Sequence, residues 1–186
     1  MDKKKLLLRI LVGVLIAGSL IVIWVLKTHP TPTSIGQGTT GELVNAENEE
    51  AFALAATAID LEALKAYGLP IIIDFGADSC KPCKAMAPIL VTMNAEMQGK
   101  AIIKFVDVWK YSDAAADFPV QVIPTQVLIN ADGTPYVTSE TIGIEFTMYS
   151  SKETIEHIFT VHQGGLTEDQ MKVILEDMGV ALVLLI

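Results

Sequence analysis

Cys80 and Cys83 are the two cysteines of this 186-residue chain, and they lie two residues apart in DSCKPCKAMAP, residues 78–88. Such a pair suits three kinds of chemistry: reversible thiol–disulfide exchange, half of a zinc site, or a structural disulfide. A zinc site needs two more ligands, and the chain's three histidines lie far away in the sequence. A disulfide that closes so short a loop restrains little unfolded-chain entropy. Redox exchange is therefore the favoured interpretation, and the other two remain open.

The neighbouring residues predict that the pair starts a helix just after a buried strand. LPIIIDF, residues 69–75, is a short apolar run typical of a buried strand, and residues 80–97 have helical spacing. Free backbone N–H groups and the helix dipole at a helix N-terminus stabilise a thiolate, here that of Cys80. Pro82 stiffens the turn without leaving an N–H group unsatisfied. We expect Cys80 to attack a disulfide and Cys83 to resolve the mixed disulfide.

The remaining elements predict an α/β domain. Residues 151–162 fit either a helix or a loop. The other expected elements are a helix over 49–68 ending at Gly68, a strand over 101–109, a short helix over 113–118, a hairpin over 125–140 and a helix over 166–180 capped by Thr167 and Gln170. The early βαβ unit requires a parallel pair and the hairpin an antiparallel one. A mixed central sheet with helices on both faces satisfies both requirements.

The chain resembles the thioredoxin family over residues 49–180. The resemblance rests on IIIDFGADSCKPCKAMAPIL (71–90), QGKAIIKFVDV (98–108) and VIPTQVLINADGTP (122–135). It implies a thioredoxin-like fold and thiol–disulfide oxidoreductase activity on protein disulfides, with a role in cell redox homeostasis. It also implies that the redox-active disulfide Cys80–Cys83 serves without a further cofactor and without a metal.

The resemblance assigns roles to five residues. Cys80 would be the exposed nucleophile and Cys83 the buried resolving thiol. Asp74 matches the family's buried acid, and a carboxyl in an apolar strand has a raised pKa that lets it exchange protons with Cys83. Ile123 and Pro124 match the family's cis-proline turn, where the residue before the proline pairs with substrate backbone. The alternatives are a solvated strand-end Asp74 and an ordinary trans Pro124.

Four further positions depart from the family or match it loosely. Ser79 and Gly76 stand where thioredoxins usually carry aromatic residues, which diminishes the hydrophobic rim of the site. Lys81 stands in place of a glycine and adds a cation beside Cys80, which favours the thiolate, unless solvent screens the charge. Lys104 matches either the lysine that faces the buried acid or an exposed lysine of a strand.

The N-terminal residues predict a membrane anchor. Residues 6–26 are nearly all apolar, with Arg9 as the one charged residue, and are long enough to cross a bilayer. Lysines at 3–5 precede them, and between Lys27 and Lys65 there is no lysine or arginine, which places the N-terminus in the cytoplasm. We expect residues 1–27 to be a transmembrane signal anchor in a bacterial cell membrane, with the domain outside the cytoplasm. A cleaved signal peptide is the alternative.

Charge and composition describe the rest of the chain. Residues 28–48, rich in Thr, Gly and Pro, read as a flexible linker, and residues 181–186 form an apolar tail too short to span a membrane. Residues 28–186 carry a net charge of −13, because residues 1–27 contribute +4 to a total of −9, and they contain no arginine. An acidic domain of this kind is a poor partner for nucleic acid.

Reduction is the preferred direction of exchange, because Asp74 and the C-x-P-C turn resemble those of the family's reductive members. A reductase outside the cytoplasm needs a source of electrons. By family analogy, this source would be a membrane thiol transporter of the cytochrome-c-biogenesis type. The alternatives are a disulfide-forming oxidant and a redox-inert anchored binding module or chaperone with the same fold.

Overall fold

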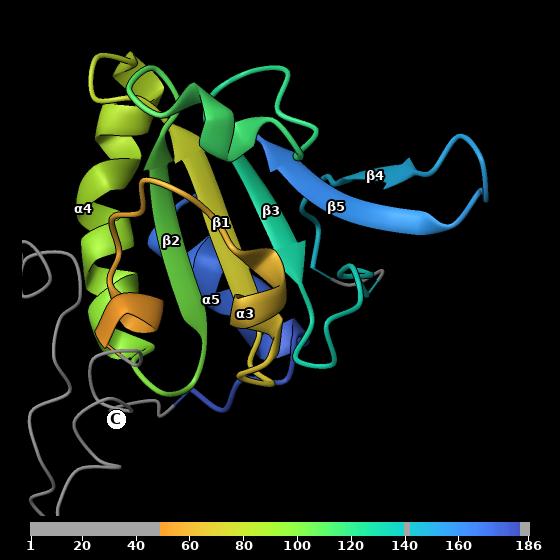
Figure 1. Ribbon diagram of the computed structural model, residues 1–186. Helices are drawn as coiled ribbons and strands as arrows, with labels where there is room; N and C mark the ends of the chain where they lie inside the picture. The colour runs from red at the N-terminus through yellow and green to blue at the C-terminus, as the bar shows by residue number, and fades with distance from the viewer. Residues whose placement is uncertain (1–48, 140–141, 183–186) are drawn as a thin grey trace, which may run out of the picture. The chain divides into compact units, whose positions relative to one another are not determined.

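A computed structural model describes residues 49–139 and 142–182, which fold around a mixed five-stranded sheet (Figure 1). The strand order is β2-β1-β3-β5-β4. β1 and β2 run parallel, and the other neighbouring pairs are antiparallel. The strands are β1 (Ile71–Gly76), β2 (Ile102–Asp107), β3 (Thr125–Ile129), β4 (Thr147–Ser150) and β5 (His157–Gln163). The mixed sheet predicted from the sequence is therefore confirmed.

Helices cover both faces of the sheet, as the sequence predicts (Figure 1). The covering elements are α3 (Leu61–Lys65), α4 (Lys81–Glu96), the 3₁₀ helix η1 (Ser112–Ala115) and α5 (Glu168–Asp177). Successive side chains of a strand point to opposite faces, so β1 contributes to two cores. Ile72 packs with α4 and α5, whereas Ile71 and Ile73 pack with α3 and η1. Asp74, two residues after Ile72, thereby points to the α4 side.

The single helix expected over residues 49–68 forms only near its two ends, with Gly68 left-handed at φ 62° after the second. Residues 49–52 are helical, and the following segment runs extended along the edge of β2 until α3 begins. The Phe105 N–H donates to a carbonyl of this segment at 2.7 Å, and the Phe105 carbonyl accepts an N–H from it at 2.9 Å. Asp60 then caps α3 by accepting from the Ala63 N–H at 3.0 Å. Backbone hydrogen bonds to the edge of β2 therefore hold this segment outside a helix, although its apolar residues have helical spacing.

The hairpin expected over residues 125–140 forms only in part. β3 and the turn are present, with Gly133 in the left-handed conformation at φ 81°. The following residues 134–139 make no second strand, and a single bridge joins Ile129 to Pro135. Pro135 has no N–H group to extend the pairing. On the side away from β1, the antiparallel neighbour of β3 is instead β5, from the segment for which a helix or a loop is expected.

The C-terminal helix begins as predicted, with a capping box between Thr167 and Gln170. The short helix expected near residues 113–118 is η1, one turn of 3₁₀ helix. Within residues 49–139 and 142–182, no helix is long and apolar enough to cross a bilayer. The expected anchor over residues 1–27, the linker over 28–48 and most of the tail over 181–186 lie outside the described residues.

Candidate redox site

Cys80 and Cys83 form a disulfide at the start of α4, with their Cα atoms 5.2 Å apart. Cys80 is the N-cap residue in an extended conformation, and its Sγ accepts from the Cys83 N–H at 3.3 Å. Pro82 lies in the first turn, as expected. Cys80 is 8% exposed and Cys83 4%, so the expectation of an exposed Cys80 is wrong for the disulfide state. Ala77 and Ile123 pack around the pair and cover it.

The Ile123-Pro124 peptide bond is cis, as the sequence predicts, and it lies beside the disulfide. The Ile123 carbonyl oxygen is 3.9 Å from Cys80 Sγ. The Thr125 hydroxyl donates to the Val122 carbonyl at 2.7 Å and closes the turn around the proline. The turn therefore presents a backbone carbonyl beside the sulfur that the sequence assigns as the nucleophile.

Asp74 is fully buried near the end of β1, on the α4 side of the sheet. Its Oδ1 accepts a hydrogen bond from Gln126 Nε2 at 2.6 Å, and its Oδ2 has no hydrogen-bond partner among the described residues. Burial raises the pKa of this carboxyl to about 6, although the hydrogen bond from Gln126 lowers it. The expectation of a solvated strand-end carboxyl is excluded, and the group is poised to exchange protons near neutral pH.

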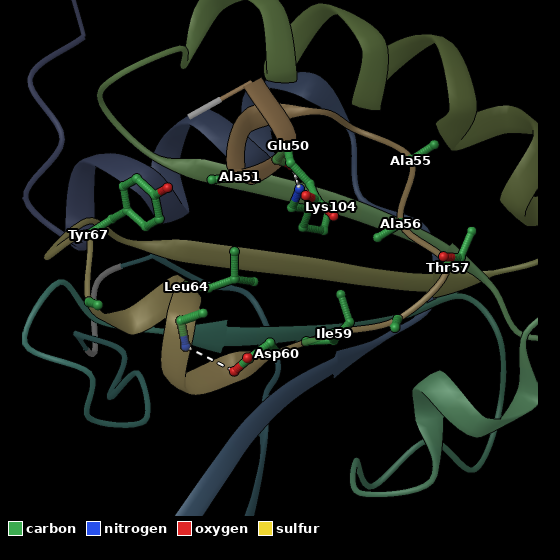
Figure 2. Close-up of a pocket in the computed structure, with 13 residues that line it drawn as sticks. Glu50, Ala51, Ala55, Ala56, Thr57, Ile59, Asp60, Leu64, Tyr67 and Lys104 are labelled. Carbon is green, nitrogen blue, oxygen red and sulfur yellow. Dashed lines mark hydrogen bonds between the residues drawn. The ribbon is translucent and has the colours of Figure 1, made fainter. Parts of the chain in front are cut away.

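Lys104 meets neither of the two sequence expectations. It lies opposite Ile73 in the register of β1 and β2, so its side chain points away from the face of Asp74. It is buried, and its Nζ donates to the carbonyls of Glu50 at 2.6 Å and Ala53 at 2.8 Å. Figure 2 shows it pointing toward Glu50 in a pocket of about 730 Å³ on the α3 side of the sheet. Burial lowers the pKa of Lys104, although the charge of Glu50 opposes this shift.

Lys81 is the first residue of α4, and its side chain is exposed. Ser79, at the other flank of Cys80, is exposed as well, whereas Gly76 is buried at the end of β1. A methyl group at Gly76 would come within 3.0 Å of the Phe105 ring, tighter than ordinary contact. Gly76, which the resemblance places at an aromatic position of the family, therefore has no room for an aromatic side chain here.

Asp107 positions the loop that precedes Cys80, a role that the sequence analysis missed. Its carboxylate accepts from the backbone N–H groups of Asp78 at 3.0 Å, Trp109 at 3.0 Å and Lys110 at 3.2 Å. The Lys110 ammonium also pairs with Asp78 and Asp107. Burial works against ionisation, yet these donors and the Lys110 charge hold the pKa of Asp107 below its usual value. The end of β2 is thus tied to the loop before α4.

Gln126 is the second residue that the sequence analysis missed. It is a fully buried polar side chain in β3, TQVLI, whose residues are all buried. A glutamine inside an apolar strand needs polar partners, and this signal was present in the sequence.

Comparison with known proteins decides the family. The thioredoxin family model matches residues 57–145. Thioredoxin 1 of Chlorobaculum tepidum is 43% identical over 75 residues, a match that covers 40% of this chain and 72% of that protein. The chain belongs to the thioredoxin family. A thioredoxin of Staphylococcus aureus is 33% identical over 91 residues, covering 49% of this chain and 80% of that protein.

Other relatives match over shorter parts of their length. The match to the mitochondrial thioredoxin of Mus musculus, at 35% identity over 77 residues, covers 44% of that protein.

Among solved structures, chloroplastic thioredoxin z aligns with a TM-score of 0.48 at 21% identity, covering 68% of this chain and 94% of that one. Family membership and the Cys80–Cys83 pair identify a thiol–disulfide oxidoreductase that acts on disulfide-containing proteins.

Proposed function

We propose that this thioredoxin-family protein reduces disulfides of proteins outside the cytoplasm, with Cys80 as the nucleophile and Cys83 as the resolving thiol. The observation that carries the proposal is the placement of the pair at the N-terminus of α4, close to the buried carboxyl of Asp74. The helix terminus stabilises the attacking thiolate, and the acid accepts a proton from the resolving thiol.

The reaction begins from the dithiol form. The Cys80 thiolate attacks one sulfur of the substrate disulfide, and the other substrate sulfur leaves as a thiolate. The Cys83 thiol gives its proton to Asp74 and attacks Cys80 Sγ, which expels the second substrate sulfur. Two electrons pass to the substrate, and the Cys80–Cys83 disulfide described above remains. A dithiol donor must then reduce it.

Substrate binds, in this proposal, along the turn beside the disulfide. The Ile123 carbonyl, next to Pro124 and 3.9 Å from Cys80 Sγ, accepts an N–H group from an extended substrate segment. Val122, just before it, is 53% exposed and offers apolar surface to the same segment. Lys81 adds positive charge beside Cys80 and favours its thiolate.

The proposed location rests on residues outside the described structure. Residues 6–26, with lysines before them, support an anchor in the cell membrane of a bacterium and a domain outside the cytoplasm. Electrons would then come from a membrane thiol transporter of the cytochrome-c-biogenesis type. Fractionation of cells that express the full chain tests the anchor: the protein should stay in the membrane after an alkaline carbonate wash, and release by that wash would contradict it.

Reduction of insulin disulfides tests the redox function. The wild-type protein should accelerate reduction of insulin by dithiothreitol, and Cys80→Ser should remove the acceleration. Cys83→Ser should instead accumulate a mixed disulfide with insulin, because nothing resolves it. Ser79→Ala, which changes the exposed neighbour of Cys80, is the matched control and should keep the activity. Equal rates for Cys80→Ser and the wild type would refute the proposal.

A disulfide-forming oxidant is the alternative that Lys81 favours. A cation beside Cys80 stabilises its thiolate, and a more stable thiolate tends to make the disulfide more oxidising. Oxidation of a reduced unfolded protein, faster than insulin reduction, would select this alternative.

A further inference from the structure

Gln126 lies directly against the acid of the redox site. It is opposite Asp74 in the antiparallel register of β1 and β3, so the two side chains share the α4 face of the sheet. Both side chains are fully buried. Burial of a glutamine amide beside a carboxyl is costly unless the two groups satisfy each other. Their hydrogen bond satisfies Asp74 Oδ1 and the Gln126 amide NH₂ group, whereas Asp74 Oδ2 and Gln126 Oε1 have no hydrogen-bond partner among the described residues.

The contacts of Gln126 fix which way its amide points. Its Nε2 donates to Asp74 Oδ1 at 2.6 Å and to Met86 Sδ at 3.4 Å. Met86 Sδ is itself held, since it accepts from the Leu166 N–H at 3.3 Å. Both neighbours of Nε2 are acceptors, so the amide must present its NH₂ group to them. Asp74 Oδ1 is thus held by a donor that α4 keeps in place.

The second oxygen of Asp74 borders the same space as Cys83. A methyl group added at Gly76 would lie 3.3 Å from Asp74 Oδ2 and 3.3 Å from Cys83 Cβ, with the Phe105 ring 3.0 Å away. Because Gly76 has no side chain, the Asp74 carboxyl and Cys83 border the same small space, and the Phe105 ring lies beside it. Asp74 Oδ2 has no hydrogen-bond partner among the described residues.

We propose that Gln126 is a positioning residue for proton transfer at this site: it holds Asp74 Oδ1, so that Oδ2 faces Cys83 and takes the thiol proton. The inference rests on the proposed role of Asp74 in resolving the mixed disulfide. In that step the Cys83 S–H bond breaks and its proton moves to Oδ2. The Cys83–Cys80 bond forms as the bond from Cys80 to substrate breaks, and the electron pair of that bond leaves on the substrate sulfur.

The proton transfer needs an ionised Asp74, and Gln126 is the side chain that promotes ionisation. Burial raises the pKa of Asp74 and the Gln126 hydrogen bond lowers it. The titratable group that faces the acid from α4 is Cys83, while β2 contributes the uncharged Phe105. The nearest strand lysine, Lys104, points to the other face of the sheet.

The test replaces Gln126 by methionine, which has a similar volume and no hydrogen-bond donor. Loss of the donor to a charged group should raise the pKa of Asp74 by about one to two units, followed by carbon NMR of its carboxyl. Resolution of a Cys80-linked peptide at pH 7 should then slow about two- to tenfold, because less carboxylate remains. The rate should recover as pH rises, and formation of the mixed disulfide should not change.

Three further variants isolate the effect. Val127→Ala empties space on the opposite face of β3 and should leave the Asp74 titration unchanged, even where it lowers stability. In an Asp74→Asn background, Gln126→Met should leave the resolution rate and its pH profile unchanged, since it has no carboxyl to act through. Gln126→Leu repeats the measurement should the methionine variant fail to fold.

An Asp74 pKa that stays within about 0.3 units of wild type in Gln126→Met would overturn the inference, as would an unchanged pH profile of resolution. Failure of the proposed function would give a different set of results. In that case the wild-type protein would not reduce insulin, while the NMR titration would still report whether Gln126 controls Asp74.

Discussion

At the scale of single residues, the burial that tunes the pKa of Asp74 for proton transfer also lowers the stability of the folded protein at neutral pH. Its carboxyl is fully buried, and its pKa is raised from 3.8 to about 6. Between these two values the folded protein binds more protons than the unfolded chain does. Stability must therefore fall as pH rises through this window, and the ionised carboxyl destabilises the fold at neutral pH. Such a cost is expected where a group is kept for its reactivity.

Asp74→Asn should therefore stabilise the oxidised protein at pH 7 to 8. A shift of about two pKa units corresponds to about 3 kcal/mol, which is the upper limit of the expected gain. The gain should shrink as pH falls through the window and disappear below about pH 3, where Asp74 is protonated in both states. Urea unfolding of both proteins across this pH range measures it. A difference that does not vary with pH would contradict the raised pKa.

At the scale of elements, the loop before α4 is held by the end of β2. Asp107 gathers three backbone N–H groups, among them that of Asp78, two residues before Cys80. The side chain thus links the strand that lies beside β1 to the start of the active-site helix. A change at Asp107 should act on the redox site without touching either cysteine.

Asp107→Asn should destabilise the protein by about 1–3 kcal/mol, since an amide replaces a charged acceptor of several hydrogen bonds. The pKa of Asp107 is lowered on folding, so its contribution is present above the unfolded value of 3.8 and is lost as pH falls below it. Urea unfolding at pH 7 and pH 3 should show the difference between wild type and variant shrinking at the lower pH. Asp117→Asn, on an exposed acid nearby, is the control and should change little.

Local signals in the sequence predicted part of these elements. An apolar run bounded by Pro70 and Gly76 predicts β1, and the helical spacing of apolar residues after Cys80 predicts α4. The segment over 49–68 was predicted wrongly because its partner is the edge of β2, which local spacing does not reveal. The same holds for β5, whose place depends on pairing with β3.

The sequence predicts those site residues that belong to a recognisable motif. The burial of Asp74 and the cis peptide bond before Pro124 followed from the resemblance. The sequence predicts that Lys104 faces either Asp74 or solvent, and neither prediction is correct. The register of β1 and β2 decides which face of the sheet its side chain occupies, and local sequence does not reveal that register. The contact of Gln126 with Asp74 depends on the register of β1 and β3 in the same way.

At the scale of the whole molecule, the site draws on elements from distant parts of the chain. α4 supplies both cysteines, β1 supplies the acid, and the turn before β3 supplies the cis peptide bond. This assembly supports thiol–disulfide exchange, and the proposed reductive direction rests on the resemblance of Asp74 and the C-x-P-C turn to those of the family's reductive members. The direction is a property of the entire domain, because it depends on the relative stability of its dithiol and disulfide forms.

The reduction potential of the Cys80–Cys83 pair tests this account most directly. Equilibration of the purified protein with glutathione buffers, followed by thiol alkylation and mass measurement, gives the potential. A reductase should have a value close to that of thioredoxin, about −270 mV. A value close to that of the strong periplasmic oxidants, about −120 mV, would contradict the proposed direction.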